Sequence, residues 1–106
     1  METFSHKFLA NAATMEVALH RGFSNDHYES LVKFYQERVG KGVINWDVNL
    51  QQLEIINSIG LGVLVAFNAA VASRGGRLRL ILKSDSKLSD LLRLTKLDRI
   101  INCMFL

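Results

Sequence analysis

Apolar residues recur along the 106-residue chain with two spacings, one typical of β-strands and one typical of α-helices. Segments with the two spacings follow one another, so the predicted order is strand, strand, helix, strand, helix, strand, helix, strand. The predicted strands are 8–10, 15–19, 43–50, 77–82 and 98–106, and the predicted helices are about 24–40, 58–73 and 84–95.

This order predicts an α/β fold with a mixed sheet of four to five strands. The first two strands are joined by a short turn and are expected to form an antiparallel hairpin. Strands that are connected through a helix normally lie parallel, with a right-handed crossover. We therefore expect one domain over residues 1–106, with an N-terminal antiparallel hairpin and helices packed on the sheet.

The helix predicted over 58–73 is apolar on nearly every side, whereas a surface helix usually carries a polar stripe. Two interpretations are open. The helix is packed deeply between the sheet and a neighbouring helix, or part of its apolar surface, including Leu61, Val65 and Ala72, docks a partner protein.

Several features converge at the start of this helix. A strand has ended, Ser58 lies at the boundary, and Gly60 and Gly62 leave the backbone uncrowded. The amide groups of a first helical turn carry partial positive charge and favour an anion. We predict that the Ser58 hydroxyl caps the helix and that a phosphate, either bound or attached to Ser58, is tolerated there.

Motifs for catalysis or cofactor binding are missing from the sequence. Neither glycine-rich nucleotide fingerprint occurs, and no Cys/His spacing resembles a metal site. The three histidines are scattered through the N-terminal third, and Cys103, the single cysteine, is expected to be a small buried hydrophobe. We predict a protein that is not an enzyme and that has no catalytic residues, metal or cofactor.

The charge is uneven along the chain. Residues 1–53 carry five basic and six acidic side chains, whereas residues 54–106 carry eight and four. One interpretation of the basic cluster is a patch for an acidic partner, and the other is an ordinary solvated surface. Aromatic residues are not interleaved with the cluster, so we predict no nucleic-acid partner. The cluster consists of Arg74, Arg77, Arg79, Lys83 and Lys87.

No apolar run reaches the roughly 20 residues that a membrane span requires. The N-terminal segment carries Glu2 and Lys7 and has no long apolar core, so it does not resemble a signal peptide. We therefore expect no membrane span and a cytoplasmic protein.

Three segments carry a resemblance to a known family. Residues 55–64 read IINSIGLGVL, residues 74–78 read RGGRL, and residues 92–100 read LRLTKLDRI. They are similar to the patterns F-[IM]-D-S-S-G-L-G-V-L, R-G-G-x-L and L-x-L-T-G-L-D-R-[LI] of the STAS domain family, which includes the bacterial anti-sigma factor antagonists. The similarity is specific over about residues 43–101.

The resemblance implies a partner-switching regulator. The unmodified chain would bind an anti-sigma factor that is also a serine-protein kinase, phosphorylation of Ser58 would end the binding, and a serine phosphatase would restore it. The partner would supply ATP and catalysis. The residues implied in partner binding are Asn57, Ile59, Gly60, Leu61, Gly62 and Val65.

Two alternatives remain open. STAS domains also serve as scaffold subunits that are not phosphorylated, beside transporters or in stress-signalling complexes, and Ser58 would then be only a helix cap. A sensor of a nucleotide or another small ligand is the third possibility, although no dedicated pocket motif is present.

The sequence departs from the family pattern at three positions. Asn57 replaces an aspartate, Ile59 replaces a serine, and Lys96 replaces a glycine that follows a helix. If the backbone at Lys96 is left-handed, the lysine costs about 1 kcal/mol relative to glycine.

Overall fold

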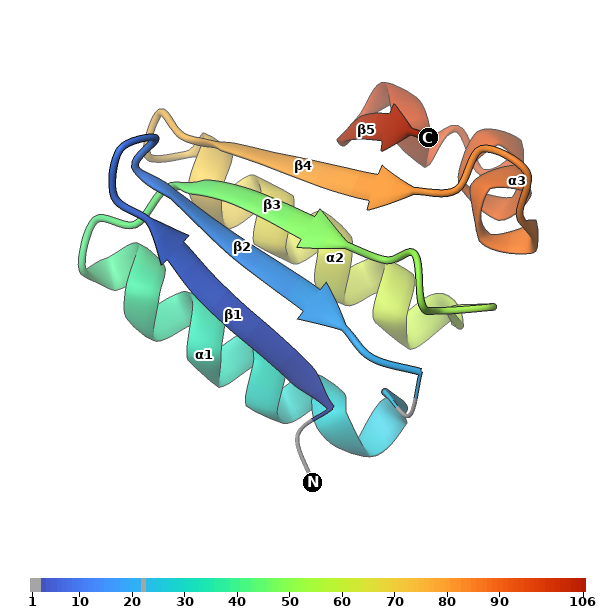
Figure 1. Cartoon of the computed structure of the whole chain (residues 1–106), viewed down its shortest axis with the longest axis horizontal. Helices are drawn as coiled ribbons and strands as arrows, with labels where there is room; N and C mark the ends of the chain where they lie inside the picture. The colour runs from blue at the N-terminus through green and yellow to red at the C-terminus, as the bar shows by residue number, and fades with distance from the viewer. Residues whose placement is uncertain (1–2, 22) are drawn as a thin grey trace.

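Five strands form one sheet in chain order within residues 3–21 and 23–106, which are the residues that this computed structural model describes (Figure 1). The first two strands pair antiparallel, and each later strand lies parallel to the one before it. The predicted mixed sheet with an N-terminal hairpin is therefore confirmed. The strands are β1 (Phe4–Leu9), β2 (Thr14–Leu19), β3 (Asn45–Asn49), β4 (Arg77–Leu82) and β5 (Asn102–Phe105).

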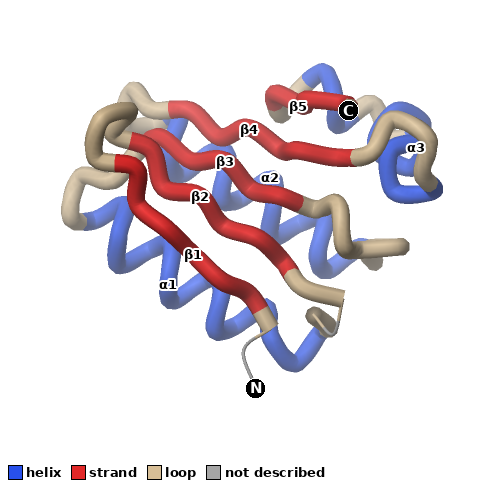
Figure 2. Tube along the Cα trace, in the orientation of Figure 1, coloured by secondary structure: helices blue, strands red, loops and turns tan. Residues whose placement is uncertain are grey.

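Helices cover one face of this sheet. α1 (Tyr28–Gly40) and α2 (Ser58–Ala72) lie side by side behind β1 to β4, and α3 (Lys87–Leu94) lies beyond the end of β4 (Figure 2). Two short 3-10 helices, Asn25–His27 and Leu97–Arg99, precede α1 and β5. Among the described residues, no helix combines the length and the apolarity that crossing a membrane requires.

The alternation of side chains along the strands explains why only one face is covered. In β3, Trp46 and Val48 are buried against the helices, whereas Asp47 faces the open side of the sheet. There Asp47 accepts two hydrogen bonds from the Arg79 guanidinium, at 3.1 and 2.9 Å. This two-pronged pair joins β3 and β4 on the polar face.

Aromatic contacts fix α2 against its neighbours. The ring of Phe67 stacks on Tyr35 of α1, with centroids 4.1 Å apart and an angle of 7° between the rings. The same ring meets the edge of Trp46 in β3 at 5.0 Å. These contacts bury the inner face of α2 between sheet and helix.

The outer face of α2 carries small residues, among them Gly62, Ala66 and Ala69, which are exposed. The apolarity of the helix therefore comes partly from glycine and alanine on the solvent side. Leu61 and Val65, which the sequence left open as partner-facing, are half-buried and pack against the core, whereas Ala72 is exposed.

Some boundaries differ from the sequence-based prediction. β1 begins at Phe4 and not at residue 8, because its first residues pair with the end of β2. The N-cap of α1 is His27, which makes no capping hydrogen bond through its side chain. The apolar spacing of 84–95 predicts inward positions at Leu88, Leu91, Leu92 and either Leu94 or Thr95. Leu88 and Leu92 are buried in α3, whereas Leu94 is 81% exposed.

The backbone at Lys96 is left-handed, with φ +61° and ψ +19°. Lys96 follows α3 and carries a side chain where glycine would be free of strain. Since the backbone is left-handed here, as the sequence analysis required for a cost, the lysine lowers stability by about 1 kcal/mol relative to glycine.

Candidate functional site

The start of α2 is capped by Asn57. Its backbone is extended, with φ −91° and ψ −179°, and its Oδ1 accepts a hydrogen bond from the Gly60 amide at 2.9 Å. Its carbonyl accepts the first helical hydrogen bond, from the Leu61 amide at 2.9 Å. The prediction that Ser58 caps the helix is therefore wrong, because the helix boundary lies one residue earlier than that role requires.

Ser58 is the first residue of the helix and is exposed. Its hydroxyl makes no hydrogen bond to another residue within the described part of the chain. Since Asn57 already satisfies the amide of Gly60, the capping bond to that amide does not need the Ser58 hydroxyl. Ser58 is open to solvent on the first turn of α2.

The two glycines of this turn have different surroundings. A Cβ on Gly60 would overlap the Tyr28 hydroxyl and the Ile56 side chain, so this residue must be glycine for α1 to approach α2. A Cβ on Gly62 would meet nothing within 4 Å. Gly60 therefore serves packing, whereas Gly62 leaves the outer surface of the helix flat.

Apolar side chains flank Ser58 on the surface. Ile55 is 72% exposed and Ile59 is 58% exposed. Ile55 also forms a shallow, mainly apolar groove with Leu91 and Leu94 of α3, and Lys87 and Asp90 complete its lining. We call the area formed by Ile55, Ser58, Ile59, Leu91 and Leu94 the α2–α3 surface.

The structure divides the residues implied in partner binding. Asn57, Ile59 and Gly62 are exposed, Leu61 and Val65 are half-buried, and Gly60 is buried beneath Tyr28.

Three members of the α2–α3 surface, Ile55, Leu91 and Leu94, were not among the residues that the sequence predicted to bind a partner. A signal exists for the two leucines, because four leucines at 88, 91, 92 and 94 exceed what one buried stripe of a short helix can hold.

The one cysteine of the chain is partly buried. Burial, assisted by the nearby charge of Asp98, raises the pKa of the Cys103 thiol to about 11. The thiol is therefore protonated at neutral pH and is a poor nucleophile. Within residues 3–21 and 23–106, no group of three His, Cys, Asp or Glu side chains is placed to hold a metal ion.

Comparison with known proteins identifies the fold. No protein-family model and no curated protein matches the sequence. A crystal structure of a candidate anti-sigma factor antagonist from Thermotoga maritima matches with a TM-score of 0.83 and 25% identity, over 94% of this chain and 84% of that chain. The chain has the fold of the anti-sigma factor antagonists.

Two further structures with this STAS-type fold are more distant in sequence. An anti-sigma factor antagonist from Mycobacterium paratuberculosis matches with a TM-score of 0.74 and 15% identity, over 94% of this chain and 84% of that chain. The anti-sigma factor antagonist SpoIIAA, in its unphosphorylated form, matches with a TM-score of 0.76 and 14% identity, over 97% of this chain and 88% of that chain. Anti-sigma factor antagonists are regulatory binding proteins and not enzymes.

The two glycines of the α2 turn give a matched test of their surroundings. We expect Gly60→Ala to lower the free energy of unfolding by about 1 to 3 kcal/mol, because the added methyl group displaces Tyr28 and Ile56. We expect Gly62→Ala to raise it by about 0.5 to 1 kcal/mol, because alanine favours the helix and the methyl group enters open space. Urea denaturation measures both, and equal effects of the two substitutions would contradict the assigned surroundings.

Proposed function

We propose that this chain is an anti-sigma factor antagonist in a partner-switching pathway. In its unmodified form it binds an anti-sigma factor that is also a serine-protein kinase. Phosphorylation of Ser58 by that partner ends the binding, and a serine phosphatase restores it. The observation that carries the proposal is the exposed Ser58 hydroxyl, which makes no hydrogen bond to the described residues, at the start of a helix whose cap is supplied by Asn57.

The local electrostatics support a phosphate on Ser58. The first turn of α2 contains no acidic residue, and its amides carry partial positive charge. A phosphoserine brings roughly −1.5 to −2 charges at pH 7. This charge is favourable at a helix N-terminus, so the folded state is expected to survive the modification.

Although the phosphate is tolerated by the folded chain, we expect it to weaken the binding of a partner. Ile55 and Ile59 offer apolar contact on both sides of Ser58. A partner that buries these side chains would have to desolvate the phosphate without a matching cation. Such a penalty amounts to several kcal/mol, enough to end binding.

The departure at Asn57 is compatible with this role. An asparagine side-chain oxygen caps a helix about as well as an aspartate carboxylate. It also places no negative charge beside the phosphate on Ser58. The substitution thus keeps the geometry of the turn and removes a repulsion within the phosphorylated form.

Incubation with the cognate anti-sigma kinase and ATP tests the phosphorylation directly. We expect the intact mass to rise by one phosphoryl group, and we expect no rise for Ser58→Ala. Binding of the same partner should be retained by Ser58→Ala and weakened at least about ten-fold by Ser58→Asp, which places a fixed charge in the interface.

Two results would contradict the proposal. One is an unchanged mass when the kinase modifies a control substrate in the same preparation. The other is equal partner binding by Ser58→Ala and Ser58→Asp, which would favour the scaffold alternative, in which the domain binds without a switch.

The apolar part of the surface has its own test. We expect Ile59→Ser to weaken binding of the anti-sigma factor about ten-fold, because the exposed side chain loses its buried contact with the partner. Phe8→Ser is the matched control. Phe8 is also an exposed large hydrophobe, at 48%, but it lies at the opposite edge of the sheet, near the turn between β1 and β2.

Calorimetric titration of the two variants with the anti-sigma factor gives the comparison. An equal loss of affinity in both would show that binding does not depend on the α2–α3 surface.

A further inference from the structure

The basic residues of segment 74–87 are separated by the fold and do not form one patch. The three arginines precede β4 or belong to it. Only Lys83 and Lys87 come together, on the loop between β4 and α3 and on the first residue of α3. This pair lies at the edge of the sheet formed by the carboxyl ends of the parallel strands.

A third cation joins them from a distant part of the sequence. Arg21, which follows β2, lines the same surface crevice as Lys83 and Lys87. Gln51 and Gln52, from the segment after β3, also line it. The crevice measures about 420 Å³, which is large enough for a small ligand.

The three cations form no ion pair with the carboxylates of residues 3–21 and 23–106. Among the described residues, no carboxylate oxygen lies within 4.0 Å of the charged groups of Arg21, Lys83 or Lys87. Glu54 and Asp85 also line the crevice, yet neither forms an ion pair with these cations. The lining therefore carries one net positive charge, held by cations that repel one another and that an anion would bring together.

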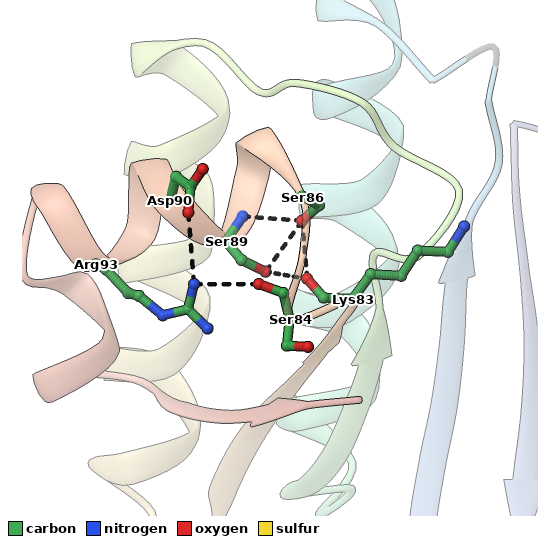
Figure 3. Close-up of polar contacts among 6 residues, drawn as sticks. All are labelled: Lys83, Ser84, Ser86, Ser89, Asp90 and Arg93. Carbon is green, nitrogen blue, oxygen red and sulfur yellow. Dashed lines mark hydrogen bonds and ion pairs between the residues drawn. The ribbon is translucent and has the colours of Figure 1, made fainter.

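The backbone on the α3 side of the crevice is held in place by a hydrogen-bond network (Figure 3). The Ser86 hydroxyl donates to the Lys83 carbonyl at 2.8 Å and accepts from the Ser89 amide at 3.1 Å. The buried Ser89 hydroxyl also donates to the Lys83 carbonyl, and Arg93 donates to the Ser84 carbonyl at 3.2 Å.

Lys83 takes part in this network through its backbone carbonyl and not through its side chain. In Figure 3 that side chain extends away from α3 toward the end of β2, the strand that Arg21 follows. The cations thus come from an ordered turn on one side of the crevice and from a separate segment on the other.

The position within the fold agrees with an anion site. Ligands of open α/β sheets bind outside the carboxyl ends of the strands. The first turn of α3 begins at Lys87 and adds partial positive charge to that of the side chains.

We propose that this crevice binds a phosphate-bearing anion, held by Arg21, Lys83 and Lys87. The site adjoins the α2–α3 surface, because Lys87 also lines the groove formed by Ile55, Leu91 and Leu94. It does not depend on phosphorylation of Ser58.

Amide NMR titration of the full chain tests the proposal, with inorganic phosphate, pyrophosphate and ATP as probes at constant ionic strength. We expect saturable shifts centred on Arg21, Gln52 and 83–87, with pyrophosphate bound more tightly than phosphate. Replacing Arg21, Lys83 and Lys87 together by glutamine should weaken binding about ten-fold or more. The control variant replaces Lys33, Lys41 and Arg74 by glutamine, which removes the same charge elsewhere, and should bind as before.

The three probes distinguish the source of the phosphate. Tighter binding of ATP than of pyrophosphate supports a nucleotide as the ligand, and equal binding supports a free phosphate or diphosphate. Binding of ATP alone would overturn the proposal, because the base and not the phosphate would then be recognised. Shifts that do not saturate, or an equal loss in the control variant, would also overturn it by showing general charge attraction.

Discussion

The hydrogen bond from the Gly60 amide to the Asn57 side chain is the interaction on which the presentation of Ser58 depends. It satisfies an amide that would otherwise lack a partner in the first turn, and it fixes the start of α2 at Ser58. Directly below, the missing side chain of Gly60 lets Tyr28 of α1 pack against the turn. Asn57 and Gly60 thus stabilise the turn, and this capping does not use the Ser58 hydroxyl between them.

The fold was predictable from the sequence because the spacing of apolar residues within a short segment is enough to identify each strand and helix. Alternating apolar residues at 78, 80 and 82 predicted β4 with its buried face, and the short break between the apolar stretches 8–10 and 15–19 predicted the hairpin turn. The cap could not be assigned, because asparagine and serine are both good N-caps and only the backbone conformation decides between neighbours. The role of Gly60 was likewise hidden, since it depends on Tyr28, which lies 32 residues away in the sequence.

The surfaces with candidate functions share one edge of the sheet. The segment after β3 begins with Gln51 and Gln52 at the basic crevice and ends with Ile55 and Asn57 beside Ser58. Parallel strands bring such segments together at their carboxyl ends, where the helix N-termini also gather. The grouping of Arg21 with Lys83 and Lys87 follows from this topology, whereas sequence proximity placed the two lysines with arginines that the fold carries elsewhere.

The central claim is that Asn57 caps α2 and that Ser58 does not. The most direct test compares the free energies of unfolding of Asn57→Ala and Ser58→Ala. We expect Asn57→Ala to lose about 1 kcal/mol, because the Gly60 amide loses its acceptor. We expect Ser58→Ala to stay within about 0.5 kcal/mol of the parent chain, as for other exposed positions without structural contacts. A loss from Ser58→Ala as large as that from Asn57→Ala would contradict this division, because the Ser58 hydroxyl would then be holding the helix.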